Sequence, residues 1–274
     1  VEVYSLEELL TVHEQFYTLL YSEEPIDSEI QNFLFSQVTS RLSQPESDSC
    51  EGPLSLEELT EALRISNKNK TPGPDGLTTE FYSSFWDFLG PLLVDVFNEC
   101  FANGELCQSM KPSLTRLVFK MDDRRCLKNW RPISLLNSDY KIGSKALSLR
   151  LSKVLGSIIN TDQTCSVLHR SSFSNLILLR DTLYFIDRSG ETGVLISLDQ
   201  EKVVDRVDRT FLPNLLNLFG FASCFRNWIL TLYNDAYMQI VVNRGIRQGG
   251  ARLCSSAIGR IAVISLLASI ELIR

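Results

Sequence analysis

Residues 196–207 read ISLDQEKVVDRV, an apolar segment that delivers a carboxylate at Asp199. The pattern predicts a strand over residues 193–199. A rigid strand with an aspartate at its end is a common way to hold a divalent cation. Two such aspartates on neighbouring strands could hold two Mg²⁺ ions for nucleotidyl transfer. Taken alone, the motif also fits a solvated or capping carboxylate, because many strands end in aspartate.

Two further motifs carry polar side chains in rigid surroundings. In residues 245–249, GIRQG, two glycines let the backbone approach a ligand and Gln248 could bond a nucleotide or template, although alone a turn is favoured. Arg131 stands beside the rigid Pro132 and near Lys120 on a candidate strand, so the two cations could hold a triphosphate. Alone, surface cations are the commoner explanation.

The rest of the sequence predicts helices interspersed with a few strands, which indicates an α+β fold. Residues 43–53 are polar with two prolines and are predicted to be a linker, and residues 71–76 a loop. Two helices are predicted to begin at the capping boxes of Ser5 and Ser55. Further helices are predicted over 30–42, 81–89, 93–101, 140–159, 173–186, 211–219 and 225–233, with a break at Gly90-Pro91 between the second and third of these. The predicted strands span 115–120, 193–199 and 237–242.

Composition indicates an ordinary globular protein, with 44% hydrophobic and 22% charged residues. The first residues lack both a basic region and an apolar run, so we expect a cytoplasmic or nuclear protein rather than a secreted one. The longest apolar run, residues 261–270, is shorter than the ~20 residues that span a bilayer, so no membrane partner is expected. None of the seven cysteines forms a CxxC pair, which favours free thiols.

Charge is divided unevenly along the chain. Residues 1–70 hold 14 acidic and 4 basic side chains, and residues 71–274 hold 19 acidic and 23 basic. Nucleic-acid enzymes usually carry a basic surface, because neutralising phosphates drives their binding. The weak basic character of the body therefore counts modestly against strong independent binding of nucleic acid.

Several motifs together resemble one family, the reverse transcriptases of non-LTR retrotransposons, and most closely those of the vertebrate long-interspersed-element type. The resemblance covers nearly the whole chain. The motifs occur in the family's order: TPGPDGL (71–77), EFY (80–82), NWRPISLL (129–136), DYK (139–141), DQT (162–164), ISLDQEKVVDRV (196–207) and GIRQG (245–249).

This resemblance implies roles for five residues and for several ligands. Asp199 matches the catalytic aspartate of the palm that binds both metal ions, Mg²⁺ or Mn²⁺. Lys120 and Arg131 match the fingers cations that hold the incoming triphosphate. Gln248 and Gly249 match the motif that lines the nucleotide and template. An RNA template and a DNA primer are the implied partners.

The sequence also departs from the family's pattern. Val204 stands where the family has a phenylalanine gate, so discrimination against the ribose hydroxyl should loosen. The strand over residues 237–243 runs directly into the glycine motif, and we expect its hairpin partner to be deleted. Residues 168–170 replace a usual Pro-Gly-Arg turn. The sequence stops at Arg274, before the aromatic-x-Asp-Asp turn that relatives carry. Asp122-Asp123 lies in a charged loop and is a poor substitute for that turn.

The sequence therefore predicts reverse-transcriptase fingers and a partial palm, with a short antiparallel sheet flanked by helices and a helical N-terminal extension. The expected units are an acidic helical extension and linker over 1–53, a fingers-like region over 54–190 and a partial palm over 191–274. The expected function is that of a fragment or decayed copy of an RNA-directed DNA polymerase, inactive alone. Two alternatives remain, an active polymerase with its remaining segments elsewhere, or a non-catalytic module that binds nucleic acid or protein.

Overall fold

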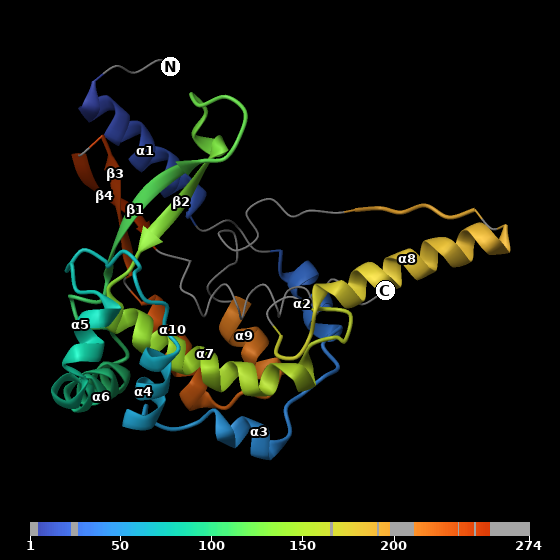
Figure 1. Cartoon of the computed structure of the whole chain (residues 1–274), viewed down its shortest axis with the longest axis horizontal. Coiled ribbons are helices and arrows are strands. Elements are labelled where there is room, and N and C mark those ends of the chain that lie inside the picture. Colours follow the sequence, from blue (N-terminus) through green and yellow to red (C-terminus); the bar gives the residue numbers. More distant parts are fainter. Residues whose placement is uncertain are drawn as a thin grey trace.

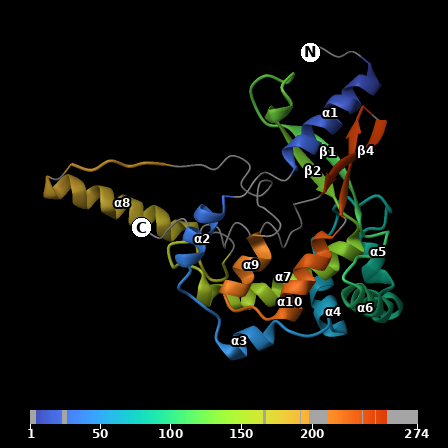
Figure 2. The same ribbon diagram turned by 180° about the vertical axis from the view of Figure 1, so that it is seen from behind.

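The computed structural model describes residues 5–22, 27–164, 167–190, 192–197, 211–234, 236–243 and 245–252. A four-stranded sheet with helix α1 lies at one end of the chain's fold, and α4 to α7 with α10 lie at the other (Figures 1 and 2). The elements are α1 Leu6–Leu20, α2 Ser28–Ser36, α3 Gln44–Ser49, α4 Leu56–Arg64, α5 Thr79–Ser84, α6 Trp86–Asn103, β1 Pro112–Phe119, η1 Leu127–Asn129, β2 Trp130–Leu135, α7 Ser138–Ile158, α8 Ser172–Ser189, α9 Phe211–Leu218, α10 Ser223–Tyr233, β3 Tyr237–Val242 and β4 Gly245–Arg252.

The sheet has the strand order β2-β1-β3-β4. Strands β1 and β2 are antiparallel, as are β3 and β4, but β1 and β3 are parallel. The α+β class is confirmed, whereas the expectation of an antiparallel sheet is wrong at its centre. A parallel pair needs a long crossover connection, and here the chain from β2 to β3 contains α7 to α10.

Helix α1 covers one face of this sheet. The paired residues Thr115 of β1 and Ile240 of β3 are both buried on that face. On β4, a Cβ added to Gly245 would lie 3.1 Å from Leu10 Cδ1 and 3.2 Å from Leu6 Cδ2, so the helix sits close to the strand's backbone. The start of the described chain therefore packs against its last described strand.

Helix α7 forms the centre of the helical part. Leu147, Leu151 and Leu155 follow one another at helical spacing and are fully buried. The helix packs against α4, and the ring of the buried Phe97 on α6 approaches its backbone at Gly143. This packing places the N-terminal end of α7 beside the sheet (Figure 1).

The stretch expected to be a linker, residues 43–53, is instead folded against the body. It begins with α3, where the backbone N–H and the hydroxyl of Ser43 both donate to the Glu46 carboxylate. Cys50 at its end is completely buried. The prolines of the stretch misled the prediction, since a proline in the first helical turn is well tolerated.

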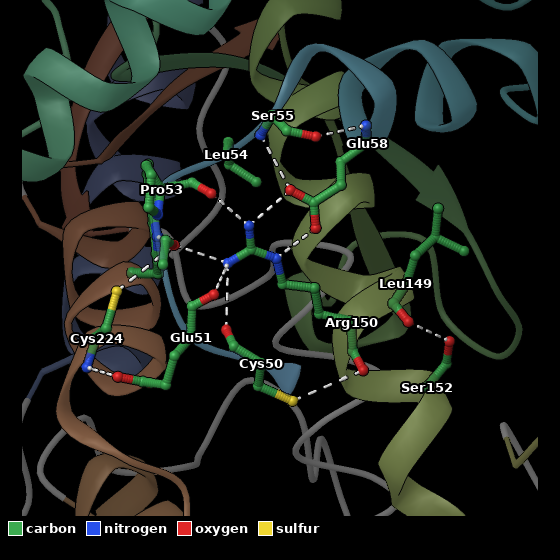
Figure 3. A network of polar contacts seen from close by, with 12 residues as sticks. Cys50, Glu51, Pro53, Leu54, Ser55, Glu58, Leu149, Arg150, Ser152 and Cys224 are labelled. Carbon is green, nitrogen blue, oxygen red and sulfur yellow. Dashed lines mark hydrogen bonds and ion pairs between the residues drawn. The ribbon is translucent and has the colours of Figure 1, made fainter. Parts of the chain in front are cut away.

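Arg150 of α7 holds this stretch in place (Figure 3). Its Nε and Nη2 donate to the two carboxylate oxygens of Glu58 at 2.5 and 2.6 Å. Its guanidinium also donates to the carbonyl oxygens of Cys50, Gly52 and Pro53 at 3.2, 2.9 and 2.6 Å. Burial alone would raise the pKa of Glu58, but the bonds from Arg150 bring it below the ordinary value. The buried guanidinium of Arg150 is thus paired with the Glu58 carboxylate and with carbonyl groups of residues 50–53.

The same loop anchors α10. The Glu51 carboxylate accepts hydrogen bonds from the backbone N–H groups of Cys224 and Phe225 at 3.1 and 2.8 Å, in the first turn of that helix. Trp228 donates its indole N–H to the carbonyl oxygen of Gly52 at 3.2 Å. The loop over residues 50–53 therefore joins α4, α7 and α10.

Two other predictions about elements are wrong. Helix α6 runs unbroken through Gly90-Pro91, and the chain breaks earlier, at Phe85. Gly90 is buried where α6 crosses α4, since a Cβ there would lie 3.0 Å from Leu56 Cδ1. Of the strand predicted over 193–199, residues 193–197 are described and form no strand.

The helix predicted over 30–42 ends earlier, because α2 spans Ser28–Ser36, and the remaining predicted helices and strands are confirmed within a few residues. No helix in the described ranges is both long and apolar enough to cross a membrane. The boundaries at residues 53 and 190 stay predictions.

Candidate functional site

The two cations predicted to hold a triphosphate lie in the β1–β2 hairpin, Arg131 on β2 and Lys120 directly after the last residue of β1. Arg131 of β2 is paired with Val118 of β1, and the N–H of Lys120 donates to the carbonyl oxygen of Asn129 at 2.9 Å. Cross-strand partners and residues two apart share one face of a sheet, so Lys120, Val118 and Arg131 point the same way. All three side chains are exposed. The structure therefore brings Lys120 and Arg131 together on one open face.

This face lies on the side of the sheet opposite α1 and is both cationic and apolar. Arg116 joins it from β1 and is paired with the exposed Ile133 of β2. Within the described residues, no hydrogen bond or ion pair engages the side chains of Lys120 or Arg131. Cations without an internal partner are available for an anionic ligand.

The loop at the tip of the hairpin is held by Asp123. Its carboxylate accepts from Nε of Arg125 at 3.1 Å and from Nη2 at 3.0 Å, and these bonds lower the pKa of Asp123. Asn129 donates its side-chain N–H to the Asp123 carbonyl oxygen, and Trp130 donates its indole N–H to that of Arg124. Asp123 is thus committed to the loop, which agrees with the poor prospects of Asp122-Asp123 as a metal site.

The glycine motif forms a strand rather than the turn favoured from the motif alone. Gln248 is paired with Gln239 of β3, and Gly249 with Met238. The turn lies before the motif, at Asn243, whose φ of +46° belongs to the left-handed region that asparagine tolerates. The glycine motif itself is therefore the hairpin partner of β3, whereas the expected deletion of a separate partner strand before the motif stays a prediction.

The strand register places the glycine motif (245–249) in the same sheet as the face bearing Lys120 and Arg131. Gln239 is paired with Gln248 on one side and with Leu114 of β1 on the other. The backbone of Gln248 consequently lies across β3 from the strand that leads to Lys120. The sheet thus carries Arg131, Gln248 and Gly249, three of the five residues to which the resemblance assigns ligand contacts, and Lys120 directly follows its strand β1.

Asp199 and Val204 lie outside the described residues. Among the residues that the structure does describe, no group of three or more His, Cys, Asp or Glu side chains could hold a metal ion. The fit of Mg²⁺ to this chain therefore rests on Asp199, and no metal-dependent step is derived from the described geometry.

Asn137 is a residue whose role the sequence did not reveal. It occupies the N-cap position of α7, but its side chain makes no cap bond. Instead its Oδ1 accepts from the N–H of Asp75 at 3.3 Å, and its Nδ2 donates to the carbonyl oxygen of Ser109 at 2.7 Å. Gly73 lies so close that an added Cβ would be 2.5 Å from the carbonyl carbon of Leu136. The motif at 71–77 and the segment after β2 are therefore packed together at the base of the hairpin.

Asp139 is a buried carboxyl group at the same place. It is 8% exposed, and its Oδ1 accepts from the backbone N–H of Tyr140. Burial raises the pKa of Asp139 to about 6, and the nearby charge of Asp75 adds to this rise. In the sequence Asp139 belongs to the motif DYK (139–141), but its place in the first turn of a helix, where carboxylates are commonly exposed, gave no sign of its burial.

Comparison with known proteins agrees with this arrangement of motifs. The sequence profile of the family described as reverse transcriptase (RNA-dependent DNA polymerase) matches residues 118–272, more than half of the chain. A protein of Xenopus laevis, named Transposon TX1 uncharacterized 149 kDa protein, is 41% identical over 244 residues. These residues make up 85% of this chain, and the match spans 19% of the length of that relative.

Proposed function

The chain belongs to the reverse transcriptase family, in its non-LTR retrotransposon branch, and on this premise we propose that the face bearing Lys120 and Arg131 binds the triphosphate of an incoming nucleotide. Family membership implies binding of an RNA template and a DNA primer, and reverse transcriptases generally use divalent metal ions such as Mg²⁺. The proposed ligand is a deoxynucleoside triphosphate.

One observation carries this proposal, the convergence of two cations on a single exposed sheet face. Arg131 is fixed by the β1–β2 ladder, and the backbone of Lys120 is bonded to that of Asn129. Their charges would neutralise phosphate oxygens, and the planar guanidinium of Arg131 can bond two of them. The sheet of which they are part also includes Gln248, which is proposed to face the nucleotide or template.

We further propose that these 274 residues do not extend a primer by themselves. Bound divalent ions supply the charge that stabilises phosphoryl transfer, and such sites usually need more than one carboxylate. Asp199 is the carboxylate that the family's motif assigns here, and the 274 residues contain no aromatic-x-Asp-Asp sequence. The chain would then act as a nucleotide- and template-binding unit.

The second candidate is a non-catalytic binding module descended from the same domain. It is favoured by His169, which stands where the family usually has glycine and yet keeps a glycine-like φ of +63°. Such a strained replacement is typical of a copy that is no longer under selection for activity.

Nucleotide binding tests the proposed site. We expect a fluorescent deoxynucleoside triphosphate with Mg²⁺ to bind the chain, and the double variant Lys120→Ala, Arg131→Ala to bind roughly tenfold more weakly or worse, because charge-assisted bonds are lost. Lys128→Ala is the matched control, since Lys128 is an exposed cation of the same hairpin. An equal loss in the control would show attraction by the hairpin's overall charge rather than a site.

Primer extension tests the second part of the proposal. The chain and its Asp199→Asn variant are compared on an RNA template with Mg²⁺ or Mn²⁺, and neither is expected to extend the primer. Extension by the chain that disappears in the variant would mean that a second carboxylate is supplied within these residues. The proposed inactivity would then be wrong, while the nucleotide site would stand.

A further inference from the structure

A ridge of large apolar side chains runs along the outer side of α5 and α6. It consists of Phe81, Phe85, Phe88 and Leu92, called here the aromatic ridge. All four are exposed, Phe88 by 71% and Phe85 by 55%. The rings of Phe81 and Phe85 lie 5.1 Å apart between centroids, so they form one continuous surface. Phe81 and Phe85 lie four residues apart on α5 and its C-cap, and Phe88 and Leu92 lie four residues apart on α6, so each helix presents two of these side chains on one side.

The fold of the described residues does not use this ridge. The inward sides of α5 and α6 are occupied by Tyr82, Leu93 and Phe97, which are buried in the core. The helices therefore have one apolar side that is packed and a second that faces outward. Exposed contiguous apolar surface of this kind commonly marks an interaction site.

The two helices that carry the ridge hold charges of one sign, although Lys68, before α5, lies close enough to Glu80 to contribute to lowering the pKa of that carboxyl group. Residues 79–103 contain four acidic residues and no lysine or arginine. Asp87 directly precedes Phe88, and Asp95 lies one turn beyond Leu92, both exposed. A phosphate backbone would be repelled here, whereas a segment rich in lysine and arginine would be attracted.

Helix α8 provides a contrast. It also exposes large apolar side chains along its length, and none of its residues is buried. Its charges are mixed, however, with Arg180 beside Asp181 and Arg188 beside Asp187. Nothing on α8 selects the charge of a partner, so it serves as a comparison surface.

We propose that the aromatic ridge is a docking site for a basic amphipathic helix of a partner protein. The partner's apolar stripe would lie on Phe81, Phe85, Phe88 and Leu92, and its lysine or arginine residues would lie over Asp87 and Asp95. In both views α5 and α6 lie far from the tip of the β1–β2 hairpin (Figures 1 and 2). A partner held there would leave the proposed nucleotide site open.

The test uses two synthetic helical peptides of 18 residues. Both carry leucine at spacings of three and four on one side, and the other side carries lysine in one peptide and glutamate in the other. We expect the lysine peptide to bind the chain at least tenfold more tightly than the glutamate peptide, measured by fluorescence anisotropy. Raising the salt concentration should weaken this preference.

Variants then locate the site. We expect Phe85→Ser with Phe88→Ser to weaken the lysine peptide at least tenfold, and Asp87→Lys with Asp95→Lys to remove its advantage over the glutamate peptide. Leu178→Ser with Leu183→Ser on α8 is the matched control and should change nothing. Circular dichroism checks that each variant keeps its helices. If the serine variants lose helical structure, the Asp87→Lys, Asp95→Lys variant provides the test of the site.

Three results would overturn the proposal. Equal binding of the two peptides would remove the role of the acidic residues. An equal loss in the α8 control would indicate unspecific adhesion to apolar surface. Displacement of the peptide by single-stranded RNA, together with loss of RNA binding in the Phe85→Ser, Phe88→Ser variant, would make the ridge a nucleic-acid surface.

Discussion

After the end of α7, Arg170 stabilises the chain through hydrogen bonds, whereas the neighbouring His169 has a strained backbone conformation. Arg170 donates to the carbonyl oxygens of Gly156, Ile159 and Gln163 at 3.1, 3.0 and 3.0 Å, which satisfies groups that the helix end leaves free. The turn that brings it there puts His169 at a φ of +63°. A side chain in this region costs about 1–2 kcal/mol, whereas glycine adopts it freely.

His169→Gly should therefore stabilise the protein. Glycine removes the strain but adds freedom to the unfolded chain, so we expect a net gain of up to ~1 kcal/mol in the free energy of unfolding. Urea denaturation measures the difference. His169→Ala keeps the strained φ and should give no gain, and an equal gain from alanine would mean that the exposed imidazole itself is unfavourable.

Asp139 is expected to make the stability depend on pH. Its pKa in the folded state is about 6, above the ordinary value of 3.8, so the folded protein binds the proton more tightly than the unfolded chain does. The contribution of this group is full below pH ~4 and is lost as the pH rises through 6. Asp139→Asn should remove this loss and gain up to ~3 kcal/mol at pH 7.

Urea denaturation at a series of pH values checks this prediction. Asp75→Asn is the companion variant, because the charge of Asp75 contributes to the raised pKa of Asp139. It should move the region of declining stability towards lower pH. A stability difference between Asp139→Asn and the parent that is the same at pH 4 and pH 7 would contradict the buried, titrating carboxyl.

At the scale of elements, α7 contains two glycines with opposite surroundings. A Cβ on Gly143 would lie 2.5 Å from Cε1 and 2.8 Å from Cε2 of Phe97, so α6 and α7 touch at this point. A Cβ on Gly156 would meet nothing within 4 Å. The first glycine serves helix packing, and the second only costs helix stability.

Alanine substitutions should therefore act in opposite directions on one helix. Gly143→Ala should destabilise by about 1–3 kcal/mol, because Phe97 is fully buried and cannot move aside. Gly156→Ala should stabilise by about 0.5–1 kcal/mol through helix propensity. Thermal unfolding followed by circular dichroism measures both, and Phe97→Leu should reduce the penalty at Gly143. Equal effects at the two sites would contradict the close approach of α6 and α7.

Most elements with local signals were predictable, although α3 was missed despite the capping bonds between Ser43 and Glu46, and those fixed by distant partners were not. The capping boxes at Ser5 and Ser55 marked the starts of α1 and α4, because the capping bonds lie within the same turn. Strand β4 was missed, because glycines favour a turn locally and only the ladder to β3 makes this segment extended. Residues 193–197 carry a strand's apolar pattern, but in the described chain they have no neighbouring strand to pair with.

The candidate site was predictable in part for the same reason. Lys120 and Arg131 are close in sequence and are joined by one hairpin, so their convergence follows from local pairing. Asn137 was missed, because its partners Asp75 and Ser109 are distant in the chain. The roles of Asp199 and Val204 rest on the family's motif and stay predictions.

At the scale of the whole molecule, Arg150 links the N-terminal part to the helical core. Arg150→Lys should destabilise by ~3 kcal/mol or more, because one ammonium group cannot replace the bonds to Glu58 and to the carbonyl groups of residues 50–53. Arg180→Lys, on the exposed surface of α8, is the control and should change stability by less than ~0.5 kcal/mol. Urea denaturation measures both variants, and limited proteolysis should cut the Arg150→Lys protein within residues 50–53.

The packing of α1 against β4 has a consequence for synthesis on the ribosome. Helix α1 is the first described element to be made, and β4, which it covers, is the last. During translation more than two hundred further residues must therefore be added before β4, which packs against the apolar side of α1, emerges. The carboxylate of Glu51 likewise lacks its hydrogen-bond donors until the N-terminus of α10 has been made. While the residues between these elements are being made, the nascent chain consequently exposes this unpaired surface, and chaperones would determine how much of the chain folds correctly.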